Sequence, residues 1–593
     1  MKYFGVAQTR NYYRSDIDGL RAIAVFQVLV FHAGFPVGRS GFIGVDIFFV
    51  ISGFLITGIL LKMQEDKTFK LRHFFERRIR RILPALFSII LISTPVAYYL
   101  MLPDDLENFG QSEIAATFSI NNFLLWLTEN YFSVRNEFKP LVHTWSLGVE
   151  EQFYFFYPFF VIFAFKIKRK IPILFSLTFL WILSFSLSVW CSVQISTTSS
   201  GFANLSVASF YLLPTRAFEL LTGAITFLTL NKFESKFLSE IHRGAIKLAG
   251  FLIIIASGLF LPKDVNYPNY LTMLPLLGAV MFLIVRSEKL ITPFITQKII
   301  LRIGLASYSI YLIHQPLFAF YRLSKFEAPN NIEFLILILV SIFLGLLSFK
   351  YIETPFRSRI NLSYRKVISV LTIMAILILV SGSQFVLKAG YYRGAKFFPI
   401  QTDLHRGQNA EFNLKPFALK KAAFLEPKKV HVLVIGNSQA RDFVNAIQTT
   451  SLMTNLEIVY RDDFEGCIDS VIYKQFMINL IEDSNYIVFG SAPKVECWNS
   501  FKKVWRNRIN TILILGEKNF GVNLNAVMIK NVRSEQQFDV RKSVIQANLR
   551  AQKVFGKNFI DMNNIIGFSK SRVPILDSSG FLISQDATHL TPK

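Results

Sequence analysis

Long apolar runs fill most of the first 390 residues and constrain the fold more than any other feature of this sequence. About 20 consecutive apolar residues are enough for a helix to cross the hydrocarbon core of a bilayer. Eleven such runs lie near residues 17–35, 42–61, 82–102, 147–165, 171–191, 206–230, 247–262, 269–286, 303–322, 333–350 and 367–387. With 52% hydrophobic and only 18% charged residues, the chain is too apolar for a disordered protein or an ordinary soluble domain. The sequence therefore predicts a multi-pass α-helical membrane protein.

The charged residues behind the net charge of +24 are concentrated in the connections between these runs. Basic side chains gather at 62–81, 166–170 and 350–366, whereas the segment 103–147 carries mainly acidic ones. This alternation is typical of membrane loops under the positive-inside rule, so we interpret the charge as topology and expect no nucleic-acid partner. An apolar stretch at 118–127 is expected to be interfacial or re-entrant, because a full crossing would export the basic residues at 166–170.

We expect about ten membrane helices in residues 1–360, then a linking transmembrane helix and a polar linker in residues 361–429. On this topology the last apolar run exports residues 430–593. Short β-rich runs alternate there with helix-length segments, at 431–435, 456–460, 486–489, 511–515 and 558–561. Such alternation predicts βαβ units, which form a parallel sheet with helices on both faces, a three-layer α/β domain.

Two ionisable residues lie within the first apolar run. Arg21 and His32 are eleven residues apart, share one face of a helix and lie about 16 Å apart along its axis. In one interpretation, Arg21 extends to the membrane surface and His32 bonds to a neighbouring helix. In the other, the two residues face a cavity, because an ionisable group inside a bilayer is costly without a partner or water.

Further ionisable residues favour the cavity. Four of them are expected at a depth similar to that of His32, in the outer half or middle of the membrane: Asp46, Glu150, Glu151 and His314. There a carboxylate could orient a His as a general base. His143 and Trp145 precede the glutamates on the outer side, where a sugar could stack on the Trp, although a boundary Trp is also a common interfacial anchor. Arg216 and Glu219 are one helical turn apart and form either a structural ion pair or a substrate contact.

The exported region carries a second set of reactive residues. Ser438 follows the strand at 431–435 within the sequence GNS, which places it at the carboxyl end of a strand, where open α/β sheets bind ligands. Asp586 and His589 lie three residues apart near the end of the chain. Ser, His and Asp together are the side chains of acyl transfer through a serine ester.

Several ordered motifs resemble the membrane acyltransferase-3 family. They are residues 13–20 (YRSDIDGL) with Arg21 and His32, 41–54 (GFIGVDIFFVISGF), 77–84 (RRIRRILP), 144–154 (TWSLGVEEQFY), 308–316 (YSIYLIHQP) and 351–357 (YIETPFR). The resemblance implies transfer of an acyl group, usually acetyl, from cytoplasmic acyl-coenzyme A to an extracytoplasmic hydroxyl, commonly of a surface polysaccharide.

Carried over by position, Arg21 and His32 match the family's paired Arg and His, and Arg78 with Arg81 matches its Arg-x-x-Arg motif. The resemblance implies that Arg21, Arg78 and Arg81 bind the acyl-coenzyme A donor and that His32 is catalytic. The spacing agrees, because Arg78 and Arg81 lie one helical turn apart and guanidinium groups bind phosphates well. Without the resemblance, such a basic cluster would be interpreted as topology.

Residues 430–593 resemble the SGNH hydrolase-like domain fused to some members of the family, such as O-antigen acetyltransferases. The resemblance implies Ser438 as nucleophile, His589 as base and Asp586 as its partner. The chain has Gly-Asn-Ser where Gly-Asp-Ser is usual and has no clear Gly-x-Asn-Asp block, so a domain that only binds glycan is the alternative. Gly466 or the segment 490–491 is the hypothesis for the oxyanion donors. A disulfide between Cys467 and Cys497 suits an oxidising compartment.

The sequence thus predicts an O-acyltransferase of a bacterial inner membrane, with a periplasmic C-terminal domain. Acetyl-coenzyme A or another acyl-coenzyme A is the expected donor substrate, and a surface or lipid-linked glycan such as lipopolysaccharide O-antigen is the acceptor. Membrane lipid is an expected partner. We expect neither a permanently bound cofactor nor a metal. Two alternatives remain: a transporter whose exported domain binds glycan, and an extracytoplasmic carbohydrate esterase.

Overall fold

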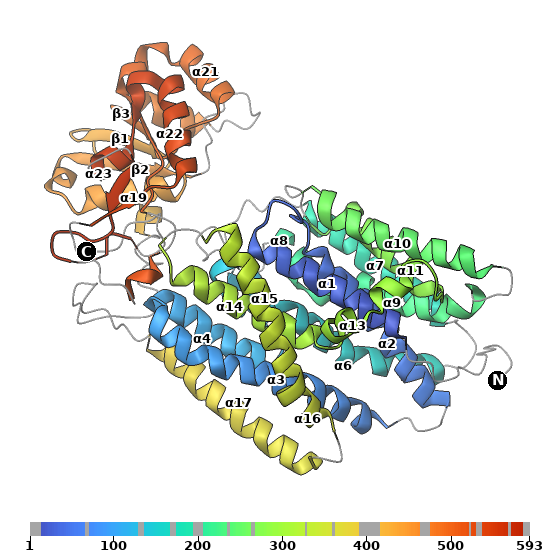
Figure 1. Ribbon diagram of the computed structural model, residues 1–593. Helices are drawn as coiled ribbons and strands as arrows, with labels where there is room; N and C mark the ends of the chain where they lie inside the picture. Colours follow the sequence, from blue (N-terminus) through green and yellow to red (C-terminus); the bar gives the residue numbers. More distant parts are fainter. Residues whose placement is uncertain are drawn as a thin grey trace. The chain divides into compact units, whose positions relative to one another are not determined.

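The computed structural model contains two compact units, one mainly helical and one built on a β-sheet (Figure 1). It describes residues 14–65, 70–128, 136–166, 173–193, 205–233, 238–262, 267–326, 329–358, 362–388, 390, 415–462, 475–520, 524–528, 536–566, 571–580 and 582–584. The first unit comprises Met1–Tyr98, Glu107–Tyr321 and Pro329–Phe385. The second comprises Val386–Lys593 together with the short segments Tyr99–Leu106 and Arg322–Ala328.

Helices account for nearly all regular structure in the first unit. In chain order they are α1 (Ser15–Ala33), α2 (Ile43–Glu65), α3 (Leu71–Leu100), α4 (Pro103–Thr117), α5 (Asn121–Thr128), α6 (Thr144–Lys166), α7 (Ile173–Ser192), α8 (Leu205–Tyr211), α9 (Leu213–Phe233), α10 (Glu240–Phe260), α11 (Met273–Ile284), α12 (Thr292–Ile295), α13 (Lys298–Leu305), α14 (Ser307–Leu323), α15 (Asn331–Ser348), α16 (Thr354–Arg357) and α17 (Tyr364–Leu387). Every predicted apolar run overlaps one or two of these helices.

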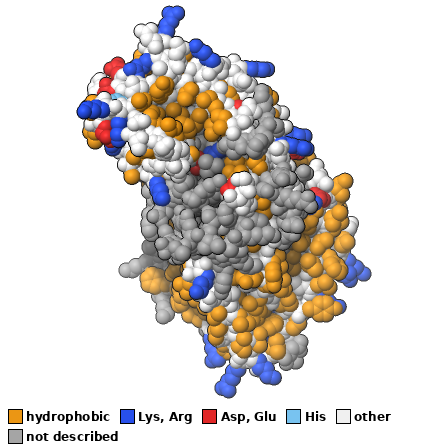
Figure 2. All heavy atoms as spheres, turned by 90° about the vertical axis from the view of Figure 1, so that its left-hand side faces the viewer, with side chains coloured by type: hydrophobic (Ala, Val, Ile, Leu, Met, Phe, Trp, Pro, Cys, Tyr) orange, Lys and Arg blue, Asp and Glu red, His pale blue; other side chains and the backbone are white. Residues whose placement is uncertain are grey.

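Six helical segments among the described residues are long and apolar enough to cross a membrane. They are Ile43–Gln64, Leu71–Leu100, Ile173–Ser192, Glu240–Phe260, Asn331–Arg357 and Tyr364–Leu387. Their outward side chains are largely apolar, as Ile373, Ile376 and Val380 of α17 are, and hydrophobic side chains cover much of the helical unit in Figure 2. The chain is therefore a multi-pass membrane protein. The stretch predicted to be interfacial or re-entrant forms the short helix α5, which at about 12 Å cannot cross a bilayer.

Helices α2 and α9 approach each other so closely that their backbones touch at two glycines. A Cβ atom at Gly53 would lie 1.8 Å from the carbonyl oxygen of Leu220, and one at Gly223 would lie 1.9 Å from that of Val50. Small residues are what allow membrane helices to pack at this distance. The crossing fixes the middle of α2, from which several side chains described below project.

The second unit contains a five-stranded parallel sheet in the order β2-β1-β3-β4-β6. The strands are β1 (Val430–Ile435), β2 (Leu456–Arg461), β3 (Tyr486–Phe489), β4 (Ile512–Leu515) and β6 (Phe559–Ile560). The prediction of a parallel sheet is confirmed, and each of the five predicted strands overlaps an observed one. An additional antiparallel pair, β5 (Gln537–Asp539) with β7 (Arg572–Pro574), was not predicted.

Both faces of this sheet are covered, because alternate residues of each strand enter different cores. On β1, Leu433 and Ile435 pack with residues of α20 (Gln475–Asp483), α21 (Val495–Val504) and α22 (Lys542–Phe555). On the opposite face, Val432 and Val434 pack against α19 (Ser438–Gln448). The two cores make the sheet the middle of three layers.

A buried carboxylate anchors the segment before β1 to the start of β2. Glu457 accepts hydrogen bonds from the backbone N–H of Leu425 (3.0 and 2.9 Å) and of Glu426 (2.7 Å), and Lys421 lies 3.3 Å away. Burial raises the pKa of this carboxyl, but the backbone N–H groups and Lys421 outweigh it and hold the pKa below its ordinary value.

The second unit also has a core to which an earlier segment of the chain contributes. Leu102 packs there with residues such as Phe520 and Val573. Asn525 accepts a hydrogen bond from the backbone N–H of Leu102 at 2.6 Å and donates one to Asp105 at 2.7 Å. Sequence reasoning missed this contribution, because residues more than 400 positions apart leave no local pattern.

Candidate active site

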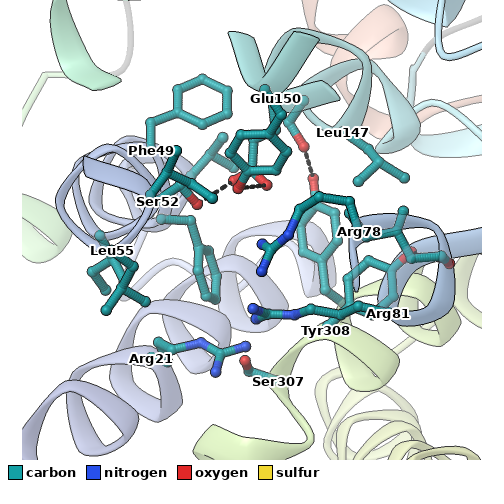
Figure 3. Close-up of a pocket in the computed structure, with 18 of the residues that line it drawn as sticks. Arg21, Phe49, Ser52, Leu55, Arg78, Arg81, Leu147, Glu150, Ser307 and Tyr308 are labelled. Atoms are coloured by element: carbon teal, nitrogen blue, oxygen red, sulfur yellow. Dashed lines mark hydrogen bonds between the residues drawn. The ribbon is translucent and has the colours of Figure 1, made fainter. Parts of the chain in front are cut away.

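Helices α1, α2, α3, α6 and α14 enclose a cavity of about 160 Å³ in the helical unit. Its floor is polar: Arg21 of α1 and Arg78 and Arg81 of α3 all line it, and Figure 3 shows their guanidinium groups pointing toward one another. The structure therefore brings together the three arginines that the sequence predicted as donor-binding residues. Half of the other lining residues come from α2, and all of these except Ser52 are apolar.

Arg78 and Arg81 differ from the neighbouring arginines of α3 because the turn of the helix directs their side chains to the cavity. Arg78 lies over the ring of Tyr154, with 5.7 Å from the guanidinium carbon to the ring centroid. By contrast, Arg77 is exposed and does not line the cavity. Arg80 is buried, but it bonds to Glu76 at 3.0 Å and to two backbone carbonyls. Two arginines of this basic run thus face the cavity and two do not, so the run is more than a topology signal.

Glu150 of α6 also lines the cavity, close to the arginines in Figure 3. Ser52 donates a hydrogen bond to one of its oxygens at 3.0 Å, and Tyr154 donates one to the other at 3.0 Å. The prediction grouped Glu150 and Glu151 with His32 at a similar depth in the membrane. Instead, Glu150 shares the arginine cavity, and Glu151 does not line it.

His32 is paired with another histidine instead. Its Nδ1 lies 2.7 Å from Nε2 of His314 on α14, and the two rings are within 7° of parallel, with centroids 5.0 Å apart. His143 packs edge-on against His314, with ring centroids 5.6 Å apart. Tyr311, which lines the cavity, donates a hydrogen bond to the carbonyl of His143 at 2.9 Å and lies 2.7 Å from the Ser146 hydroxyl. The three histidines thus adjoin the arginine cavity through Tyr311.

Asp46 belongs to a separate buried cluster. It pairs with Arg216 at 2.6 Å and accepts a hydrogen bond from Tyr267, and Arg216 lies 3.2 Å from Glu219. The guanidinium carbon of Arg216 is 5.4 Å from the ring centroid of Trp145. Neither Asp46 nor Trp145 lines the arginine cavity, and their contact with substrate stays a prediction. The pairing supports the structural interpretation of Arg216 and Glu219.

In the second unit, Ser438 is the first residue of α19 and follows β1 directly, as the sequence predicted. In this strand order, β1 lies between β2 and β3, at the point where parallel sheets of this kind bind ligands at their carboxyl edge. The Ser438 side chain is fully buried, and its hydroxyl has no hydrogen-bond partner among the described residues. Asp586 and His589 lie outside the described residues.

Two further features lie at the junction of β1 and α19, where Ser438 begins the helix. Lys518, nearly fully buried, pairs with Asp442 at 2.5 Å and donates a hydrogen bond to Gln439 at 2.6 Å. Sequence reasoning missed this ion pair, because a lone Lys after a strand carries no signal. Gly490 donates its N–H to the carbonyl of Ile435 at 2.8 Å, so this group is unsuited as the oxyanion donor predicted. Gly466 lies outside the described residues.

Gly490 is also required for packing. A Cβ atom at Gly490 would lie within 2.5 Å of three atoms of Ala440, so the residue allows β3 to meet the start of α19. Cys497 of α21 is disulfide-bonded, and Cys191 has a free thiol. The chain's third cysteine is Cys467, which the structure does not describe.

These features define a class of protein. The chain belongs to the acyltransferase-3 family, whose Acyltransferase domain matches residues 14–350, more than half of its length. The match includes all the helices that enclose the cavity. An acyltransferase domain thus accounts for most of the helical unit.

Among individual proteins, the chain is similar to the peptidoglycan O-acetyltransferase OatA of Listeria monocytogenes, with 30% identity over 60% of this chain and 57% of that protein. It is also 31% identical to YrhL of Bacillus subtilis, provisionally named a peptidoglycan O-acetyltransferase, over 58% of this chain and 55% of that protein. The chain thus spans little more than half the length of these relatives. No solved structure matches the chain significantly.

Proposed function

We propose that the chain is an O-acyltransferase that moves an acyl group, acetyl first of all, from cytoplasmic acyl-coenzyme A to a hydroxyl of an extracytoplasmic glycan. The observation that carries the proposal is the meeting of Arg21, Arg78 and Arg81 in one cavity beside the histidines. Three guanidinium groups suit the phosphates of coenzyme A, which carry several negative charges. The apolar wall from α2 suits the pantetheine arm and the acyl group.

In the proposed reaction, the glycan hydroxyl attacks the thioester carbonyl while His32 accepts the hydroxyl proton. The new carbon–oxygen bond forms, the carbon–sulfur bond breaks, and the coenzyme A thiolate leaves and takes up a proton. On an alternative route the Ser438 hydroxyl, rather than the glycan, attacks the thioester carbonyl first and forms a serine ester. The glycan hydroxyl then attacks that ester, the Ser438 oxygen leaves, and His589, oriented by Asp586, passes the glycan proton to it. A serine ester would divide one difficult transfer into two easier ones.

The acceptor is a surface glycan. The name of the Listeria relative supports peptidoglycan as the first acceptor to test, and lipopolysaccharide O-antigen is the second. We place the protein in a bacterial inner membrane, with an SGNH-like domain from residue 430 onward on the periplasmic side. The disulfide at Cys497 supports an oxidising compartment for that domain.

The test is the alkali-labile acyl ester content of surface glycan in a deletion strain that carries wild type, His32→Ala or Ser438→Ala at equal expression. We expect wild type to restore the ester and His32→Ala to lose it. Loss in Ser438→Ala as well would support the two-step route, and retention would make the second unit a binding module. If wild type restores no ester but changes solute uptake, the chain is a transporter; if it lowers ester content, it is an esterase.

A further inference from the structure

The contact between His32 and His314 indicates which ring nitrogens carry protons. His32 lies in the last turn of α1, and His314 lies in the middle of α14, fully buried. Their rings are within 7° of parallel, and Nδ1 of His32 is 2.7 Å from Nε2 of His314. At this distance the two nitrogens share a hydrogen bond, so one of them carries the proton.

A second contact decides which nitrogen that is. Nδ1 of His314 lies 2.5 Å from the backbone carbonyl oxygen of Tyr311, one turn earlier in α14. A carbonyl oxygen only accepts, so Nδ1 of His314 must be the donor. Neutral imidazole has a single N–H, which leaves Nε2 of His314 as an acceptor. Nδ1 of His32 is therefore the donor in the pair, and the lone pair of neutral His32 resides on its Nε2.

We propose that His314 is a positioning residue that holds His32 in the Nδ1-protonated tautomer, so that Nε2 of His32 is the atom that accepts the proton of the acceptor hydroxyl. The inference rests on the proposed function for the identity of that hydroxyl. In many enzymes a carboxylate orients the basic His, and the sequence predicted such a carboxylate here. A neutral imidazole performs the same task without adding a charge to a buried site.

The arrangement also favours the protonated state of His32 during transfer. When Nε2 takes up the proton, the Nδ1–H bond to His314 becomes a charge-assisted hydrogen bond, which is roughly twice as strong as a neutral one. Tyr311 is itself fixed, because its hydroxyl bonds to the carbonyl of His143 on the neighbouring segment. His314 thus links the base to the cavity wall without lining the cavity.

Two substitutions in the full chain test the role of the acceptor atom. His314→Gln keeps an oxygen that can accept from Nδ1 of His32, whereas His314→Leu keeps apolar bulk and removes the acceptor. We expect the Leu variant to lose about 10- to 100-fold in kcat, the range found for partners that orient metal-ligating histidines, and the Gln variant to recover most of it. The KM for acetyl-coenzyme A should change in neither, because His314 does not itself line the arginine cavity.

The opposite ranking, with the Leu variant active and the Gln variant inactive, would show that His314 only fills space and would overturn the proposal. The tautomer itself is measured by ¹⁵N NMR of the full chain labelled on histidine, at a pH near 9 where imidazoles are neutral. The His32 signals are identified by their loss in His32→Ala. An Nε2-protonated His32 in wild type would refute the inference. A wild type without acyl transfer would refute the proposed function instead, while the NMR result still decides the role of His314.

Discussion

Replacing Arg78 and Arg77 one at a time separates ligand binding from membrane topology. The two residues are adjacent in α3, and each alanine substitution removes one positive charge from the same end of the same helix. Only Arg78 lines the cavity, whereas Arg77 is exposed. A hydrogen bond to a charged group contributes about 1.5–3 kcal/mol. Since about 1.4 kcal/mol is tenfold in an equilibrium constant, Arg78→Ala should weaken acyl-coenzyme A binding roughly 10- to 150-fold.

The assay is acyl-coenzyme A titration of inverted membrane vesicles that contain equal amounts of each variant, with KM as the readout. Arg77→Ala should stay within about twofold of wild type, because an exposed charge is screened by solvent. Equal losses in both variants would mean that the basic run acts through topology alone. An unchanged KM in Arg78→Ala would refute the assignment of the arginines to the donor phosphates.

Three other predictions follow from packing and from one buried carboxylate. Gly53→Ala should destabilise the full chain in detergent by about 1–3 kcal/mol through overpacking, because the new Cβ meets the backbone of α9. The readout is a lower thermal midpoint. Gly58→Ala should lower the midpoint less, because its Cβ meets only the edge of an aromatic ring. Leu433→Ala should cost about 2–5 kcal/mol in pulse proteolysis of the second unit, against under about 0.5 kcal/mol for the exposed Val430→Ala. Glu457→Gln should lower the urea midpoint of that unit at pH 7. Because the pKa of Glu457 is lower in the folded chain than in the unfolded one, its stabilisation is present above about pH 4.3 and decreases as the pH falls through the folded value. A difference between wild type and Glu457→Gln that grows as the pH falls below about 4.3 would contradict this.

The parallel sheet was predictable because its strands are short apolar runs of β-branched residues bounded by polar segments. The run at 431–435 is an example, and the observed strand Val430–Ile435 differs from it by one residue. Strands β5 and β7 were missed because each has only three residues and no periodic pattern. Their pairing is settled by tertiary contacts between segments that are about 35 residues apart.

The two α3 arginines of the cavity were identified through the family resemblance, since the basic run alone would have been interpreted as topology. Their spacing agrees with the resemblance, because residues three apart lie on one face of a helix. The partner of His32 was not predictable in this way. Depth in the membrane can be estimated from position in an apolar run, but the lateral neighbour depends on helix packing. Glu150 and His314 were expected at the same depth, and packing turned one toward the arginines and the other toward His32.

The position of the three arginines has a consequence for turnover. Under the proposed function they bind the phosphates of coenzyme A, which are identical in the acylated donor and in the free thiol that remains after transfer. Interactions with this shared part stabilise both complexes equally and cannot favour release of the product. Free coenzyme A should therefore be a competitive inhibitor with an affinity close to that of the donor. The rate of glycan acylation would then follow the cytoplasmic ratio of acyl-coenzyme A to coenzyme A, which couples the cell surface to the energy metabolism of the cell.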